Sequence, residues 1–207
     1  MTRVTATVNG AISIVNAIAT WKGATLGIAS SVEATVNTSD GRGVFLESDN
    51  KNISSKLVNK VVELAVPKKE LEKNKIEISI KSQIPTGYGL KSSSAISSVV
   101  SLACHKIFKT HYADAQVLSA GIDASIATNV SMTGAYDDAC ACYFGGTIVT
   151  DNKMRKIIKM QKTPTDLCAV IFVPRSRKRG NIKNLRMLAD VFESYMEIGR
   201  ASCRERV

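Results

Sequence analysis

The sequence predicts an α+β fold in which a mixed β-sheet packs against helices. Apolar residues alternate with polar ones in some segments and recur every three or four positions in others. The two patterns are interleaved, with no internal repeat and no long linker. A chain of 207 residues that is 44% hydrophobic also has enough apolar side chains for a core.

Period-two alternation predicts the strands, because successive side chains of a strand point to opposite faces of a sheet. The clearest examples are residues 4–8, 28–36 and 76–84, and later candidates are residues 147–149 and 167–173. Helical spacing occurs in residues 53–64, 96–107 and 117–125, with Asp114 as the expected N-cap of the last, and residues 181–195 predict another helix. The charged stretch 67–75 indicates a helix-to-strand loop.

Residues 1–150 are expected to form one unit, and a second region is expected to begin at Asp151 with a strand, a basic loop and a helix. Residues 197–207 have neither periodicity, and their back-translation resembles a sequencing adapter, so we exclude them from the interpretation. We expect the natural protein to continue differently beyond them. Without these residues the net charge of +10 becomes +9.

Composition argues against several classes of protein. No apolar run is long enough for a membrane span, and the first residues lack a signal-peptide pattern, so a cytoplasmic protein is expected. The five cysteines form no CxxC pair, and the two histidines lack partners at zinc-ligand spacing. We therefore expect reduced cysteines in the core and neither a disulfide framework nor a zinc site.

The positive charge predicts an anionic partner, which could be a nucleotide, a small metabolite or a nucleic acid. The densest basic runs, residues 153–162 and 175–179, contain no aromatic residues that could stack on bases. A solvated basic face is therefore favoured over a nucleic-acid patch.

The segment from Pro85 to Ala95 has the composition of a phosphate-binding loop. A predicted strand ends before Pro85, Gly87 and Gly89 permit unusual backbone angles, and a predicted helix follows. The free N–H groups and the dipole at a helix N-terminus attract anions. The segment matches neither the Walker A motif nor the dinucleotide fingerprint, and a serine-capped helix after a glycine turn is the alternative.

The segment resembles the second signature of the GHMP kinases, Pro-x-x-x-Gly-Leu-x-Ser-Ser-x-Ala, and its Lys-Ser-Ser-Ser form resembles the archaeal shikimate kinase branch. Residues 16–28 and 133–146 resemble two further blocks of that branch. Trp21 stands where that branch is expected to have glycine, and the third, glycine-rich motif of the family is missing. The resemblance implies a GHMP kinase fold, with an ATP-binding domain in residues 1–150 and a truncated C-terminal α/β domain in residues 151–196.

The resemblance also implies the site and its cofactors, ATP and magnesium. ATP is expected to be bound by Pro85, Thr86, Gly87, Tyr88, Gly89, Leu90, Lys91, Ser92, Ser93, Ser94 and Ala95. Magnesium is expected at Ser94 or Ser93, with Asp123 as a further candidate ligand. Asp137 is the first choice for the carboxylate that orients or deprotonates the acceptor, Asp138 is the second, and Lys22 is a candidate partner of the transferred phosphate.

The implied activity is ATP-dependent phosphorylation of the 3-hydroxyl of shikimate in aromatic amino-acid biosynthesis. Because homoserine and mevalonate are also small carboxylates, another GHMP kinase, such as a homoserine kinase, is an alternative. A non-catalytic, basic nucleic-acid-binding protein is an alternative from another class. No nucleic acid and no membrane are expected as partners in the favoured interpretation.

Overall fold

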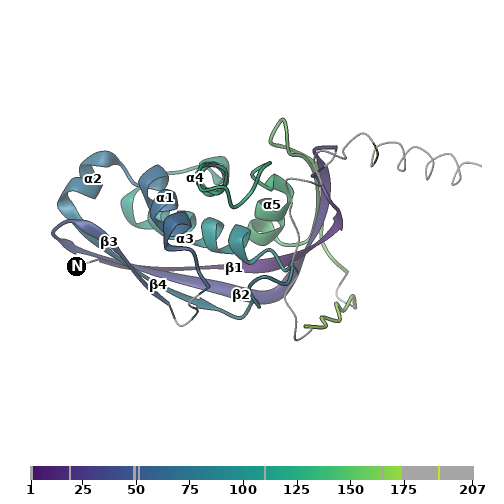
Figure 1. The fold of residues 1–207 in the computed structure, drawn as a ribbon, viewed down its shortest axis with the longest axis horizontal. Helices are drawn as coiled ribbons and strands as arrows, with labels where there is room; N and C mark the ends of the chain where they lie inside the picture. Colours follow the sequence, from purple (N-terminus) through teal and green to yellow (C-terminus); the bar gives the residue numbers. More distant parts are fainter. Residues whose placement is uncertain are drawn as a thin grey trace, which may run out of the picture.

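The structure is a computed structural model, and it describes residues 2–18, 20–48, 50, 52–109, 111–164, 166–173 and 191 (Figure 1). Within these residues a six-stranded mixed sheet carries helices on one face, which confirms the predicted α+β class. The strands are β1 (Thr2–Val15), β2 (Lys22–Asp40), β3 (Gly43–Ser48), β4 (Asn74–Ser82), β5 (Thr147–Asp151) and β6 (Lys156–Gln161). The helices are α1 (Ser55–Ala65), α2 (Lys68–Lys73), α3 (Ser92–Phe108), α4 (Asp114–Ala127) and α5 (Tyr136–Phe144).

β2 is the organising strand of the sheet. One of its edges pairs with β1, and the other edge pairs with β5 near its beginning and with β4 near its end, all antiparallel. β3 adds to β4 in parallel, and β6 adds to β5. The same strand therefore links the part of the sheet under α1 to the part under α5.

The core lies between the sheet and the helices. Val32, Ala34 and Val36 of β2 alternate onto the buried face, as the sequence predicts, and are fully enclosed. α3 supplies most of the opposing surface, and its buried positions include Val99, Val100, Ala103 and Cys104. Such burial contributes roughly 25 cal/mol per Å² of apolar surface removed from water.

Several predicted boundaries differ from the structure. The 67–75 stretch forms the short helix α2 and leads directly into β4, because its lysines and glutamates favour a helix after Pro67. Asp114 is the first residue of α4, and Ala113 is its N-cap. Residues 167–173 form no strand, and the predicted helix 181–195 lies outside the described residues except for Val191. β6 pairs with β5, so the sheet continues past residue 150.

Three of the four cysteines in the described residues lie in the core, as the sequence predicts. Cys104, Cys140 and Cys142 are free and buried, and Cys168 is free and exposed, whereas Cys203 lies outside the described residues. Burial raises the pKa of Cys104 and of Cys140 to about 12, so both thiols stay protonated at neutral pH. Where the structure describes the chain, we find no cluster of metal-ligating side chains and no helix able to span a membrane.

Candidate active site

The loop between β4 and α3 has free backbone donors. Gly87 and Gly89 have φ angles of 90° and 81°, in the left-handed region, and Lys91 adopts φ 60° as the N-cap of α3. The first backbone bond of the helix runs from the Ala95 N–H to the Lys91 carbonyl, at 2.9 Å. Within the described chain, the N–H groups of residues 92–94 have no hydrogen-bond partner. No side chain caps α3, so the alternative of a serine-capped helix does not hold, and the chemistry of these N–H groups would suit an anion.

Contacts at both ends hold the loop in place. The Asn50 side-chain amide donates to the Thr86 hydroxyl at 2.9 Å, and the Ala11 N–H donates to the Leu90 carbonyl at 3.4 Å. The Leu90 side chain is buried in the core, whereas Gly89 faces open space where an added Cβ would touch nothing. The open segment from Gly87 to Gly89 is thus tied to β1 on one side and to the loop after β3 on the other.

A buried acid pair opens α5. Asp137 and Asp138 are only 3% and 8% exposed, and both lie beside the N-terminus of the helix, whose dipole favours negative charge. The Thr25 hydroxyl on β2 lies 3.1 Å from Asp137 Oδ2 and 3.2 Å from Asp138 Oδ1. A hydroxyl has a single proton, so Thr25 donates to one carboxylate at a time. It can accept a hydrogen bond from the other acid only when that acid is protonated.

Lys91 links the loop to the acid pair. Its Nζ lies 3.1 Å from Asp138 Oδ2, and both side chains are largely enclosed. Burial, and then the negative charge of Asp137, raise the pKa of Asp138 to about 6, against the opposing effect of Lys91. A carboxylate with such a pKa takes up and releases protons near neutral pH.

Asp137 is held on all sides by hydrogen bonds and packing. The Asn152 amide Nδ2 donates to Asp137 Oδ1 at 2.7 Å, and the Asp137 N–H donates to Asn152 Oδ1 at 3.1 Å. A Cβ built on Gly23 would lie 2.3 Å from Asp137 Oδ2, so only glycine fits at this point of β2. Asp137 Oδ1 therefore accepts from Asn152, while Oδ2 shares the Thr25 hydroxyl with Asp138.

Two predicted site residues are not brought to the acid pair. Gly23 and Thr25 of β2 face the carboxylates, and strand alternation therefore places the exposed Lys22 on the other face. Asp123 on α4 pairs with Arg155, on the turn between β5 and β6. No hydrogen bond or ion pair connects Asp123 with Ser93 or Ser94 in the described part of the chain. Ser93 is exposed and Ser94 half-buried in the first turn of α3.

Trp21 has a backbone conformation that favours glycine, the residue expected at this position in the archaeal branch. Its φ is 63°, in the left-handed region that glycine enters without a Cβ penalty. Its N–H donates to the Ala17 carbonyl at 3.0 Å, and its carbonyl accepts from the Asn152 N–H at 2.7 Å. The turn before β2 is therefore bound directly to Asn152, which in turn binds Asp137.

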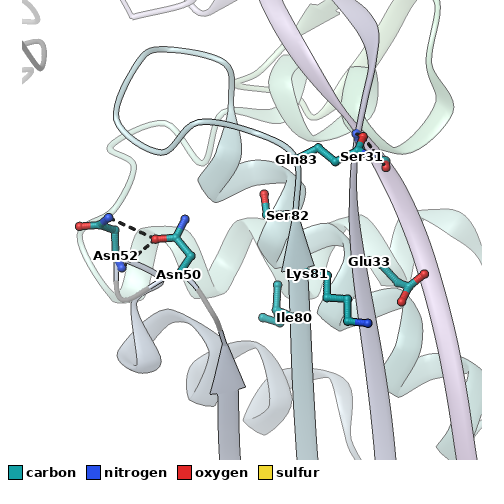
Figure 2. Close-up of a pocket in the computed structure, with 8 residues that line it drawn as sticks. All are labelled: Ser31, Glu33, Asn50, Asn52, Ile80, Lys81, Ser82 and Gln83. Atoms are coloured by element: carbon teal, nitrogen blue, oxygen red, sulfur yellow. Dashed lines mark hydrogen bonds between the residues drawn. The ribbon is translucent and has the colours of Figure 1, made fainter. Parts of the chain in front are cut away.

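A polar pocket of about 680 Å³ lies next to the loop (Figure 2). Its walls come from β2, from the end of β4 and from the loop after β3, and include Glu33, Asn50, Asn52, Lys81 and Gln83. β3 ends at Ser48 opposite Ile80, so within the described residues the last part of β4 has no strand neighbour on this side. Because Asn50 also contacts Thr86, the pocket and the loop form one continuous surface.

The sequence did not point to Thr25 or Asn152 as site residues. Thr25 lies in the block 16–28 that resembles the archaeal branch, and alternation gives its face of the strand, but only the tertiary structure places it beside the two acids. Asn152 follows β5 with no motif around it. Only the pairing of β5 with β2 brings it to Asp137.

Comparison with known families agrees with this geometry. The family model described as "GHMP kinases N terminal domain" matches residues 56–146, which include the loop and the acid pair. Among solved structures, a galactokinase from Lactococcus lactis has a TM-score of 0.64 at 18% identity, covering 76% of this chain and 46% of that one. A mevalonate kinase from Methanococcus jannaschii has a TM-score of 0.61 at 14% identity, covering 77% of this chain and 56% of that one. At these identities the likeness shows the fold alone.

Curated relatives identify the branch of the family to which the chain is similar in sequence. The chain is 36% identical over 203 residues to the shikimate kinase of Methanosarcina mazei, covering 95% of this chain and 68% of the relative. It is 37% identical over 168 residues to that of Pyrococcus furiosus, covering 80% and 61%, and 38% identical over 173 residues to that of Pyrococcus abyssi, covering 81% and 61%. The chain thus spans roughly two thirds of their length. With its glycine-serine loop and buried acid pair, it belongs to the archaeal shikimate kinases of the GHMP kinase family.

Proposed function

We propose that this chain forms the nucleotide-binding and acid-bearing part of a kinase that transfers the γ-phosphoryl group of ATP to the 3-hydroxyl of shikimate. The ion pair between Lys91 and Asp138 is the single observation that supports this most strongly. Lys91 belongs to the loop that would bind the phosphates, and Asp138 to the helix start that would face the acceptor. Phosphoryl transfer needs these two functions within a few ångströms of each other.

In the proposed reaction, the acceptor oxygen attacks the γ-phosphorus. The bond between the γ-phosphorus and the bridging oxygen then breaks. The hydroxyl proton passes to Asp138, and the electron pair of the broken bond leaves with ADP. Protonated Asp138 can donate to Thr25, which then donates to Asp137. Lys91 and the N–H groups of residues 92–94 neutralise the charge on the phosphates.

The hydrogen bonds favour Asp138 over Asp137 as the base, whereas the sequence motif favours Asp137. Asn152 holds Asp137 through both the side chain and the backbone N–H of that residue, whereas Asp138 pairs with Lys91 of the loop and shares the Thr25 hydroxyl with Asp137. Asp138 exchanges protons near neutral pH and borders the loop through Lys91. We assign the base to Asp138, with Asp137 as the fixed charge beside it.

The residues at the loop fit a magnesium ion that arrives with the nucleotide. Magnesium keeps several waters and binds through few protein groups plus substrate phosphates, so the lack of a multi-carboxylate cluster in the described chain is compatible with it. The hydroxyls of Ser93 and Ser94 would hold it at the start of α3. The bound ion would supply positive charge to the phosphates. The role of Asp123 as a magnesium ligand stays a prediction from the sequence, and in the structure Asp123 pairs with Arg155. The role of Lys22 as a partner of the transferred phosphate also stays a prediction.

We assign the polar pocket beside the loop to the base of ATP. Its volume of about 680 Å³ accommodates a nucleobase, and its lining is rich in polar side chains. The hydrogen bond between Asn50 and Thr86 places the pocket next to the phosphate loop. ATP would then lie with its base over the end of β4 and its phosphates at α3.

A panel of acceptors tests the proposal. The complete protein that contains this chain would be assayed with ATP, magnesium and, separately, shikimate, homoserine, mevalonate and galactose. We expect turnover of shikimate with a kcat/KM at least about 100-fold above that of the other acceptors, as for a site that pairs with the hydroxyls of its substrate. Turnover of homoserine alone would support the alternative kinase, and no turnover of any acceptor would refute the kinase proposal.

A further inference from the structure

Asn152 occupies the centre of the hydrogen-bond network behind the acid pair. It follows β5 and is only 3% exposed. Its amide Oδ1 accepts from the Asp137 N–H at 3.1 Å and from the Thr150 hydroxyl at 2.7 Å, while its Nδ2 donates to Asp137 Oδ1 at 2.7 Å. Its own N–H donates to the Trp21 carbonyl at 2.7 Å. One residue thus connects the end of β5, the start of α5 and the turn before β2.

These contacts determine the orientation of the amide. The oxygen must face the two donors, so the NH₂ group must face the Asp137 carboxylate. A carboxylate at position 152 would put oxygen against oxygen at 2.7 Å, and an apolar side chain would leave the Asp137 N–H and Oδ1 unpaired in a buried site. Asparagine satisfies all the partners at once.

The amide acts on the reaction through Asp137. With Oδ1 bound to Asn152 and Oδ2 bound to Thr25, the Asp137 carboxylate is fixed as an acceptor. It cannot swing toward Lys91 and compete with Asp138 for that ammonium group. The negative charge beside Asp138 therefore stays at a constant place while the proton moves.

We propose that Asn152 is a positioning residue of the phosphoryl-transfer site, which holds Asp137 as a hydrogen-bond acceptor beside the base Asp138 and fixes the Trp21 turn against both. This inference rests on the proposed function. It predicts that changes at position 152 lower kcat and leave the KM for ATP nearly unchanged, because Asn152 does not contact the phosphate loop among the described residues.

Among the described residues, three charged or titratable groups surround Asp138. They are Asp137 and the buried Cys142 on α5 and Lys91 at the start of α3, while β2 contributes the uncharged Thr25. Burial raises the pKa of Cys142 well above its ordinary value, so its thiol stays protonated. A carboxyl introduced at position 152 would lie against Asp137 and so add one more titratable group near Asp138. Burial beside a negative charge would raise the pKa of this carboxyl toward neutrality.

The test compares Asn152→Asp with Asn152→Leu, two variants of similar shape, in the complete protein. At pH 8 we expect both to lose about 100-fold in kcat, with the KM for ATP within about threefold of wild type. As the pH falls to 6, the carboxyl introduced at position 152 becomes protonated and can donate to Asp137 as the amide did. The activity of Asn152→Asp relative to wild type should then rise about tenfold, while that of Asn152→Leu should not.

Asn74→Asp is the matched control. Asn74 donates to the Glu70 carboxylate at 3.0 Å at the end of α2, so this variant also puts an acid against an acid, but outside the site. It should keep the wild-type kcat at both pH values. Thermal unfolding and ATP binding would be measured for every variant. If Asn152→Leu fails to fold, Thr150→Val, which removes one donor to Asn152 Oδ1, should still lower kcat several-fold with an unchanged KM for ATP.

The possible failures are separable. If the wild-type protein phosphorylates another acceptor of the panel, the Asn152 comparison is made with that acceptor, and the substrate assignment alone fails. A kcat within about threefold of wild type for both Asn152 variants, or the same pH response in the two, would overturn the positioning role. An inactive wild-type protein would overturn both proposals, because the second rests on the first.

Discussion

At the residue scale, the acid pair has two carboxylates with different surroundings. Asp137 accepts hydrogen bonds on both oxygens from Asn152 and Thr25, whereas Asp138 faces Lys91 and the phosphate loop. Two adjacent acids in one buried site repel each other, and the pKa of Asp138 rises to about 6 in consequence of burial and of this repulsion. The neighbouring residues therefore suit different roles, which their adjacency in the sequence does not reveal.

Asp138→Asn should abolish turnover and stabilise the fold. We expect kcat to fall at least about 1,000-fold, within the usual contribution of a general base, and that of Asp137→Asn to fall less, by about 100-fold. In wild type, kcat/KM should decline as the pH drops through about 6, where Asp138 becomes protonated. A larger loss in Asp137→Asn than in Asp138→Asn, measured by steady-state kinetics, would return the base to Asp137.

The stability of the same variant follows from the sign of the pKa shift. The pKa of Asp138 is raised on folding, so the folded state loses stability as the pH rises through about 6 and the buried carboxylate ionises. The neutral amide of Asp138→Asn avoids this cost. At pH 7.5 its Tm should exceed that of wild type by about 3 °C or more, and the difference should shrink toward pH 4. A lower Tm of the variant at pH 7.5 would contradict the raised pKa.

Trp21 provides a second prediction at this scale. Its φ of 63° costs roughly 1 kcal/mol for any residue with a Cβ, and glycine avoids that cost. Trp21→Gly and Trp21→Ala both remove the ring, so their difference in stability isolates the backbone. Chemical denaturation should find Trp21→Gly more stable than Trp21→Ala by about 1 kcal/mol; equal stabilities would mean that the turn relaxes out of the left-handed region.

At the element scale, β2 and α5 approach each other closely enough to exclude a side chain. Gly23 lies against the Asp137 carboxylate, and a Cβ on Gly27 would lie 2.9 Å from the Ala141 carbonyl. α3 contributes the other half of the site, because its first turn offers unpaired N–H groups and its N-cap offers Lys91. The site is thus built where one strand and the starts of two helices meet.

Gly23→Ala tests this close approach. A methyl group 2.3 Å from a carboxylate oxygen must displace Asp137, so we expect kcat to fall more than tenfold and the free energy of unfolding to fall by about 1 to 3 kcal/mol. Ala29→Val is the control, because Ala29 lies on the same strand with an exposed side chain. Urea denaturation and kinetics of both variants check this. Wild-type kinetics in Gly23→Ala would show that Asp137 can move without consequence.

At the scale of the whole molecule, β2 connects the substructures that carry the site. It pairs with β1 along most of its length and with β4 and β5 on the other edge, and α3 packs across it (Figure 1). β6 lies at the edge of the sheet and has mostly exposed side chains. Stability is therefore expected to be highest at the centre of β2 and lowest at β6.

Native-state hydrogen exchange should reveal this gradient. The amides of residues 32–36, hydrogen-bonded within the sheet and buried by α3, should exchange only on global unfolding. The amides of β6 should exchange through local opening, at least about 100-fold faster than those of β2. Equal protection in the two strands would show that the sheet opens as one cooperative unit.

The helices and strands with strong periodicity were predictable, since β2, β4, α1, α3 and α4 each have enough apolar positions at one spacing. β3 and β6 were missed, because β3 alternates only between half-buried and exposed side chains and β6 is mostly exposed, so neither has a buried apolar face. The strand expected at residues 167–173 is absent, since an apolar run by itself does not supply a pairing partner.

The α+β class, the glycine-serine loop before α3 and the acid pair could be predicted from the sequence, because each depends on spacing within a short segment. The difference between the two acids could not be predicted, because it depends on contacts across the fold. Lys91, Thr25 and Asn152 come from three distant segments, and strand pairing around β2 brings them to opposite sides of one buried pair. Contacts between distant residues therefore decide that Asp137 is held by an amide and that Asp138 pairs with a lysine.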